Sequence, residues 1–193
     1  MSRLWLLCLT LLAATNVKAQ AIVRWEGATD LDMYHQVQKD LALAVKKHIQ
    51  VLTVSLSSPG GPVLTSLEIA KLVRDTEETT GLIVEIHASM ICASGCTFVL
   101  AAGTPGHRYI AREILFLVHS MHNSTEECTV YVPDPKTQDD KATDLTFDLM
   151  RSAYMRYTGR SLAEVTHWTT CGEELVGKGN LAVMLNMADR TES

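Results

Sequence analysis

The fold of this chain is predicted by residues 82–102, which read LIVEIHASMICASGCTFVLAA. The first six of them, residues 82–87, form an apolar run with the length and composition of a buried strand. Residues 97–102 form a second apolar run, which we expect to be a helix that stops at Gly103. Between the two runs, Cys92-Ala93-Ser94-Gly95-Cys96 places a serine where a strand turns into a helix.

The segments on either side repeat this order of strand, turn and helix. Residues 51–56 are expected to form a strand that ends at the turn Ser58-Pro59-Gly60-Gly61-Pro62, and a helix is expected over residues 63–74. Residues 107–110 and 114–118 are expected to be two short strands, the second apolar on both faces, as in a buried parallel sheet. This alternation predicts an α/β fold with crossover helices.

The rest of the chain is expected to be largely helical. The further elements are a helix capped by Thr29 or Asp30 and reaching about His48, a polar loop over 120–140, a helix over 143–157, a helix behind a Ser161–Glu164 capping box that reaches about Trp168, and a final helix with a frayed tail.

The composition is that of a globular domain behind an export signal. The 193 residues are 47% hydrophobic and 20% charged, which suits one domain with a sizeable core. A basic start at Arg3, an apolar run over 4–14 and the small residues of Val17-Lys18-Ala19 are typical of a secretory signal peptide. We therefore expect a signal peptide over 1–19 and the folded domain over 20–193. An uncleaved N-terminal anchor is the alternative interpretation.

The net charge disfavours two classes of partner. The formal net charge is −5, and removal of residues 1–19 takes away Arg3 and Lys18, so that it becomes −7. An acidic chain without a basic stripe is a poor binder of nucleic acid or of an anionic membrane surface. No other apolar run is long enough to cross a bilayer, so no membrane span is expected once the signal peptide is cleaved.

Four cysteines follow the signal peptide, at positions 92, 96, 128 and 171. An even number in an exported chain indicates two disulfides, and the residues alone leave all pairings open. The spacings do not match a zinc finger or ribbon, and nothing predicts a helix that would confirm a site at His119 and His122 with Cys128 or Glu126. We therefore expect neither a metal nor a cofactor.

Ser94, His119 and the glycine turn each follow a strand, and together they are the parts of an acyl-transfer site. Serine becomes a nucleophile when a base takes its proton, and the oxyanion that develops needs backbone N–H donors. Gly95 offers an N–H at a helix start, and Gly61 offers another that no side chain obstructs. Each residue alone has an ordinary structural explanation, as a helix cap, a turn or a polar residue at a strand exit.

Several segments in register resemble the proteolytic subunit of the Clp protease, over roughly residues 50–165. The matching segments are Ser58-Pro59-Gly60-Gly61-Pro62-Val63, Ala93-Ser94-Gly95 with Ala101-Ala102-Gly103, His107-Arg108-Tyr109, Leu117-Val118-His119 and Tyr157-Thr158-Gly159-Arg160-Ser161-Leu162. The separation of 25 residues between Ser94 and His119 also matches that family. With its signal peptide and its Cys-x-Ser-x-Cys sequence, the chain resembles an exported branch of the ClpP/crotonase superfamily.

The resemblance implies a fold and a set of roles. The fold would be a single α/β domain of the ClpP/crotonase type, a superhelix of repeated ββα units. Ser94 would be the nucleophile, His119 the base, and Gly61 and Gly95 the oxyanion-hole donors. Because members of the family form rings, the resemblance also implies a homo-oligomer.

The resemblance fails at the third catalytic position. The family has an aspartate where this chain has Trp168. Glu173 or Glu174 could substitute, or a backbone or hydroxyl group could orient His119, and an inactive site is the remaining alternative.

The same comparison favours one disulfide pattern. Cys171 lies near the expected third-member region, and Cys128 lies in the loop after His119. We therefore favour long-range bridges from Cys92 and Cys96 to these two cysteines, which would fasten the segments that flank the site.

The leading hypothesis is a periplasmic serine hydrolase, a peptidase that works through an acyl-enzyme. The chain has no ATP-binding motif, and an exported protein would lack an ATP-driven unfoldase, so its substrates would be short or already unfolded peptides. One alternative is an inactive peptide-binding or assembly module that holds an extended peptide against Gly60 and Gly61. A weaker alternative is a crotonase-type acyl-thioester enzyme, which would use the two oxyanion donors without needing Ser94.

Overall fold

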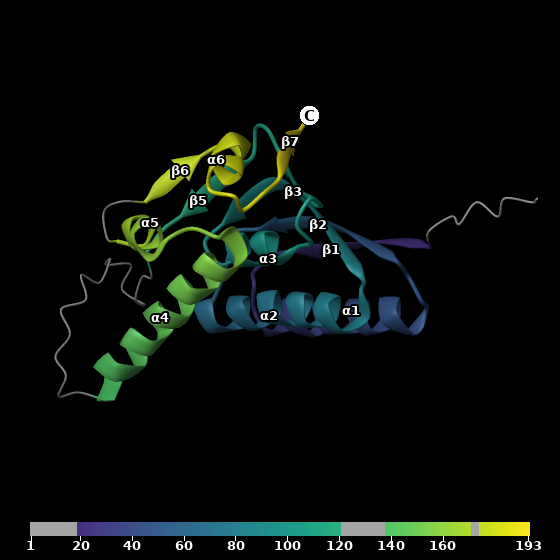
Figure 1. Ribbon diagram of the computed structural model, residues 1–193, viewed down its shortest axis with the longest axis horizontal. Helices are drawn as coiled ribbons and strands as arrows, with labels where there is room; N and C mark the ends of the chain where they lie inside the picture. The colour runs from purple at the N-terminus through teal and green to yellow at the C-terminus, as the bar shows by residue number, and fades with distance from the viewer. Residues whose placement is uncertain (1–18, 121–137, 171–173) are drawn as a thin grey trace, which may run out of the picture.

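The computed structural model describes residues 19–120, 138–170 and 174–193, with only the backbone of 138–144, and shows a mixed α/β domain (Figure 1). In chain order the elements are β1 (Gln20–Glu26), α1 (Leu31–Lys46), β2 (Val51–Ser58), α2 (Val63–Thr80), β3 (Ile83–Ala93), α3 (Cys96–Ala102), β4 (Arg108–Ala111), β5 (Leu115–Val118), α4 (Gln138–Thr158), α5 (Leu162–Trp168), β6 (Leu175–Gly177), α6 (Gly179–Met184) and β7 (Arg190–Glu192). The α/β class that the sequence predicted is confirmed.

One long strand organises the sheet. The strand order is β1-β2-β3-β4-β7, and every neighbouring pair along this path is parallel. The middle of β3, residues 86–88, pairs with β4, whereas its last residues, 91–93, pair with β5. β6 adds to the other side of β5 in the antiparallel direction. The end of β3 is therefore flanked by β2 on one side and by β5 on the other.

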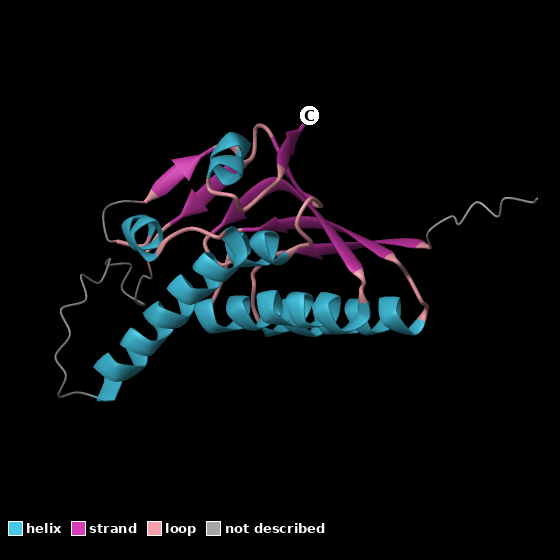
Figure 2. Ribbon diagram, in the orientation of Figure 1, coloured by secondary structure: helices cyan, strands magenta, loops and turns pink. Residues whose placement is uncertain are grey.

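Helices α1 and α2 lie side by side along one face of the strands β1 to β3, as Figure 2 shows. The buried apolar residues of α1 recur every three or four positions, so that they share one face of the helix: Met33, Val37, Leu41 and Ala44. α2 contributes Ile69, Ala70 and Val73 to the same core. Helix α3, which follows Ser94, is buried along its whole length, so this end of the sheet is covered as well.

Most helix boundaries agree with the sequence signals. Asp30 caps α1 by accepting hydrogen bonds from the backbone N–H groups of Asp32 and Met33, and Gly81 ends α2 in the left-handed conformation at φ 73°. The capping box of Ser161 and Glu164 at the start of α5 is also present. Helix α4 contacts α2, α3 and α5, while its first turns extend away from the sheet (Figure 1).

The predictions were wrong in three places. Strand β1 was not predicted. It is an edge strand in which only Trp25 is fully buried, so its sequence shows no clear pattern of buried apolar residues. The expected final helix and frayed tail instead contain β6, α6 and β7, and β7 is held by pairing with β4. Leu115 is half exposed, so β5 is not buried on both faces as expected.

Within the described residues, no helix is both long enough and apolar enough to cross a membrane.

Candidate active site

Ser94 occupies a sharp turn between β3 and α3, and its backbone lies in the left-handed region at φ 53°. This conformation is uncommon for a residue with a side chain and costs of order 1 kcal/mol or more, so the surroundings must hold it. Three hydrogen bonds do so. The N–H of Ser94 donates to the carbonyl oxygen of Leu117 at 2.9 Å, and the carbonyl oxygen of Ser94 accepts from both the backbone N–H of Thr97 at 3.0 Å and its Oγ1 at 2.6 Å.

The pairing of β3 with β5 brings the segment that carries His119 to the turn at Ser94. In this register Ala93 lies opposite Leu117, so Ser94 is next to Val118, and His119 follows directly. Ser94, His119 and Gly61 line one cavity of about 470 Å³. The structure therefore brings together three of the residues that the sequence predicted for the site, whereas Gly95 is not among the residues that line this cavity.

A backbone carbonyl orients the ring of His119. Nδ1 of His119 is hydrogen-bonded to the carbonyl oxygen of Ser120, which only accepts hydrogen bonds. Nδ1 must therefore carry the proton in this contact, and in the neutral ring the lone pair lies on Nε2. This is the tautomer that a general base requires.

The residue at the expected aspartate position belongs to the core instead. Trp168 is 5% exposed, and its ring meets that of Tyr154 edge-on, with centroids 6.4 Å apart. Of the two glutamates that could substitute, Glu174 is exposed just before β6, and Glu173 lies outside the described residues.

The glycine turn after β2 packs directly against the turn at Ser94. Gly60 has φ 95°, and a Cβ atom there would lie 2.5 Å from Cβ of Ser94, so any side chain would push the two turns apart. The N–H of Gly60 donates to Oγ of Ser58 at 3.0 Å. Among the described residues, none accepts a hydrogen bond from the N–H of Gly61 or Gly95.

A buried pair of hydroxyls, missed in the sequence, supports this turn from behind. Ser66 donates to the carbonyl oxygen of Pro62 at 2.9 Å, so its oxygen accepts the hydroxyl proton of Thr29 at 2.7 Å. Both residues are completely buried, and a Cβ atom on Gly61 or Gly95 would collide with Oγ1 of Thr29. Thr29 had been considered only as a helix cap, and nothing in the sequence links it to Ser66.

The cavity wall beyond Ser94 is mainly apolar. Its side chains come from the start of α2, from α3 and from α4: Val63, Leu64, Phe98, Met150 and Tyr154, with Thr146. Burial raises the pKa of Tyr154, which keeps the phenol neutral and able to donate. Because Thr97 donates to Ser94, the Tyr154 hydroxyl must donate to Oγ1 of Thr97, 2.7 Å away.

The disulfide pattern differs from the one we favoured. Cys92 and Cys96 are joined to each other, with Cα atoms 5.2 Å apart, and therefore form no long-range bridge. The turn at Ser94 folds the chain back from strand to helix, which brings these two residues within the usual disulfide range. Cys128 and Cys171, the other two candidates, lie outside the described residues.

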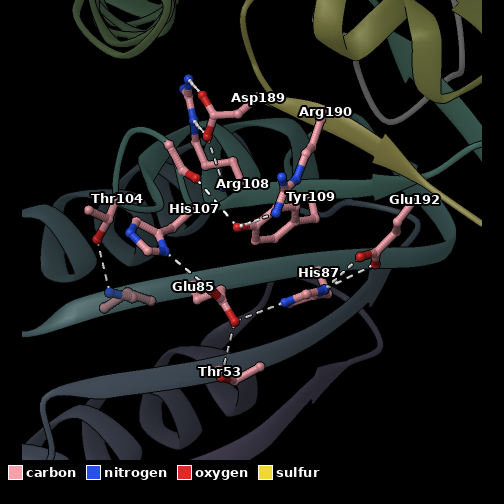
Figure 3. A network of polar contacts seen from close by, with 12 residues as sticks. Thr53, Glu85, His87, Thr104, His107, Arg108, Tyr109, Asp189, Arg190 and Glu192 are labelled. Atoms are coloured by element: carbon pink, nitrogen blue, oxygen red, sulfur yellow. Dashed lines mark hydrogen bonds and ion pairs between the residues drawn. The ribbon is translucent and has the colours of Figure 1, made fainter. Parts of the chain in front are cut away.

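A second polar cluster joins the middle of the sheet to its C-terminal strand (Figure 3). Glu85 contacts His87 through one carboxylate oxygen and His107 through the other, and His87 in turn contacts Glu192 of β7. Burial would raise the pKa of Glu85, but the hydrogen bonds with His107 and His87 outweigh it and lower that pKa. His87 also stacks on Tyr109 at 4.6 Å, so the cluster fastens β7.

No group of three or more His, Cys, Asp or Glu side chains in the described parts of the chain could hold a metal ion. His122, Glu126 and Cys128, the candidate ligands considered with His119, lie outside those parts.

The comparisons with known proteins agree with this geometry. The model of the Clp protease family matches residues 12–171, which is most of the chain. The chain therefore belongs to the Clp protease family, which places it, at a coarse level, among serine peptidases. Its fold is that of the ClpP catalytic domain. The solved ClpP protease catalytic domain from Plasmodium falciparum is similar over 89% of this chain and 84% of its own, with a TM-score of 0.70 and 13% identity. A search of curated proteins gave no match.

Proposed function

We propose that this protein is an exported serine peptidase that acts through an acyl-enzyme formed on Ser94. The observation that supports this most directly is the shared cavity of Ser94, His119 and Gly61, set by the pairing of β3 with β5. Nε2 of His119 accepts the hydroxyl proton as Oγ of Ser94 attacks the carbonyl carbon of a peptide bond. The N–H groups of Gly61 and Gly95 hold the oxyanion of the tetrahedral intermediate.

The second half of the reaction uses the same groups. The protonated His119 donates its proton to the amine nitrogen as the peptide C–N bond breaks, which leaves the acyl group on Ser94. Water then attacks this ester while His119 accepts the water proton, and return of the proton to Oγ of Ser94 releases the acid. No other acid or base is needed.

A backbone carbonyl contributes to the orientation of the base. The Ser120 carbonyl holds the proton on Nδ1 of His119, so that Nε2 can accept the hydroxyl proton of Ser94. The nucleophile is therefore expected to react with strong acylating or phosphonylating reagents.

The cavity and the N-terminal sequence support the rest of the proposal. The apolar wall around Ser94 suits an extended peptide with apolar side chains, and short or unfolded peptides need no ATP-driven partner to reach it. The basic start, apolar run and small residues of 1–19 support export to the periplasm, with the domain beginning at Gln20. Homo-oligomeric assembly is part of the proposal because the chain belongs to a ring-forming family.

One observation favours a second candidate, a non-catalytic peptide-binding module. Trp168 stands where the family has an aspartate, and it is built into the core, so this position offers no carboxylate to His119. Such a module would keep the groove along Gly60 and Gly61 and bind peptides there without cleaving them.

Labelling with a fluorophosphonate separates the two. The oxidised protein, residues 20–193, is treated with the reagent and its intact mass is measured, with Ser94→Ala and His119→Ala as controls. A single adduct that is absent in Ser94→Ala and much slower in His119→Ala supports the peptidase. A folded, oxidised protein that gains no adduct would refute it and favour the binding module.

A further inference from the structure

The Cys92–Cys96 disulfide closes a short loop with Ser94 at its centre. Cys92 is the penultimate residue of β3, and Cys96 is the first residue of α3, so the bridge ties the strand to the helix across the turn. Both cysteines are completely buried. Among the residues from Cys92 to Cys96, only Ser94 has a positive φ. The bridge thus spans the one strained residue of the turn.

The other contacts that hold this turn are noncovalent. The hydrogen bond to Leu117 holds the amide before Ser94, and two hydrogen bonds from Thr97 hold the carbonyl after it. Gly60 touches the turn by packing. A serine with φ 53° gains free energy by moving toward negative φ, and that movement would separate the start of α3 from the end of β3.

We infer that Cys92 and Cys96 are positioning residues whose disulfide holds Oγ of Ser94 in its reactive place, so that the site is fully competent only when they are oxidised. This inference rests on the proposed function for its effect on reactivity. Its structural part, that the bridge keeps the turn at Ser94 ordered, does not need the site to be catalytic. The two parts are tested by separate measurements.

The redox step is a two-electron exchange with a dithiol. Reduction breaks the S–S bond, adds one proton and one electron to each sulfur, and converts the dithiol into its own disulfide. Because both sulfurs are buried, a dithiol reaches them only when the turn opens, so the folded oxidised form resists reduction. In the reduced protein, before Cys92 and Cys96 are oxidised, the turn would be relaxed and Ser94 would react poorly.

The test measures fluorophosphonate inactivation kinetics on three forms of residues 20–193: oxidised wild type, reduced wild type, and Cys92→Ala with Cys96→Ala. Thiol alkylation and mass spectrometry verify each redox state. Cys128→Ser with Cys171→Ser serves as the matched control, because it removes the other two cysteines of residues 20–193 and keeps this bridge. We expect the maximal inactivation rate to fall by about 10- to 100-fold in the reduced and double-alanine forms, since an error of about 1 Å in placing a reacting atom has this order of effect. The fluorophosphonate concentration that gives half of the maximal rate should differ by less than about twofold between the forms, since the reagent still binds in the cavity.

Hydrogen exchange of the peptide over residues 90–98 reports on the turn independently of reactivity. Its amides should exchange at least about tenfold faster without the bridge, while peptides from α1 should keep their protection. Equal exchange in the oxidised and reduced forms, or equal inactivation rates, overturns the inference. If the oxidised protein forms no adduct, the proposed function fails, and hydrogen exchange alone then decides whether the bridge orders the turn.

Discussion

The backbone N–H of Ser94 donates to the carbonyl oxygen of Leu117 at 2.9 Å, and this contact joins the turn of the candidate nucleophile to the strand that leads to the candidate base. This hydrogen bond extends the pairing of β3 with β5 by one residue. His119 follows Leu117 by two residues and lines the same cavity as Ser94. The geometry of the site therefore depends on strand register as much as on the two side chains themselves.

The two hydroxyls behind Ser94 should control its reactivity in a graded way. Thr97→Val removes one of the two donors to the Ser94 carbonyl, which keeps the backbone N–H of Thr97 at 3.0 Å. It should lower the maximal inactivation rate by about fivefold, because one hydrogen bond contributes about 1 kcal/mol. Tyr154→Phe removes the hydroxyl that donates to Oγ1 of Thr97 but keeps the Thr97 hydroxyl, so it should lower the maximal inactivation rate less. Thr97→Ser keeps the donor and should restore the wild-type rate. Equal rates in Thr97→Val and Thr97→Ser would contradict this role.

Gly60 should tolerate no side chain. Gly60→Ala must accept φ 95°, which strains the backbone, and must also place Cβ 2.5 Å from Cβ of Ser94. The steric clash should lower the free energy of unfolding by about 1–3 kcal/mol in addition to the cost of the backbone strain. Gly106→Ala is the matched control, since Gly106 has φ 87° and open space around it. Urea unfolding of both variants measures the difference. If the two variants lose the same stability, the close packing of Gly60 against Ser94 is wrong.

Breaking the ion pair of Arg108 and Asp189 should cost more stability than breaking an exposed pair, because the Arg108 guanidinium is buried. Arg108 is 3% exposed and donates to both carboxylate oxygens of Asp189, at 2.7 and 3.1 Å. Asp189→Asn leaves this guanidinium buried without a counter-charge, which should lower the free energy of unfolding by about 3 kcal/mol. Glu78→Gln, which breaks the exposed pair with Arg156, should cost less than about 1 kcal/mol. Thermal unfolding measures the stability of both variants. If Asp189→Asn and Glu78→Gln lose a similar free energy of unfolding, the burial of the Arg108 guanidinium does not have the expected cost.

The cluster at Glu85 should make stability depend on pH in one direction. The pKa of Glu85 is lowered from its ordinary 4.5, so its ionised form favours the folded state. The stabilisation is present above pH 4.5 and is lost as pH falls through the lowered pKa. Glu85→Gln should therefore have a lower free energy of unfolding than wild type at pH 7. This difference in the free energy of unfolding, the gap, should become smaller below pH 4.5. Urea titrations at several pH values measure this gap, and a gap that stays constant between pH 7 and pH 3 would refute the assignment.

Local signals in the sequence predicted much of the fold. The apolar run of residues 82–87, the glycine turn and Gly81 indicate strands, turns and helix ends because each depends on neighbouring residues alone. The same kind of signal failed at β1 and β7. These strands are stabilised by pairing with β2 and β4, which are distant in sequence, and their own residues carry little periodicity.

The sequence by itself determined that Ser94 follows a strand, that His119 follows another, and that a glycine turn follows a third. Only the tertiary structure decided that Cys92 pairs with Cys96, that the carbonyl of Ser120 contacts Nδ1 of His119, and that Thr29 and Ser66 support the turn. The reason is physical. Strand ends and turns follow from local conformational preference, whereas a disulfide partner or a hydrogen-bond acceptor depends on which segments the folded chain brings within a few ångströms.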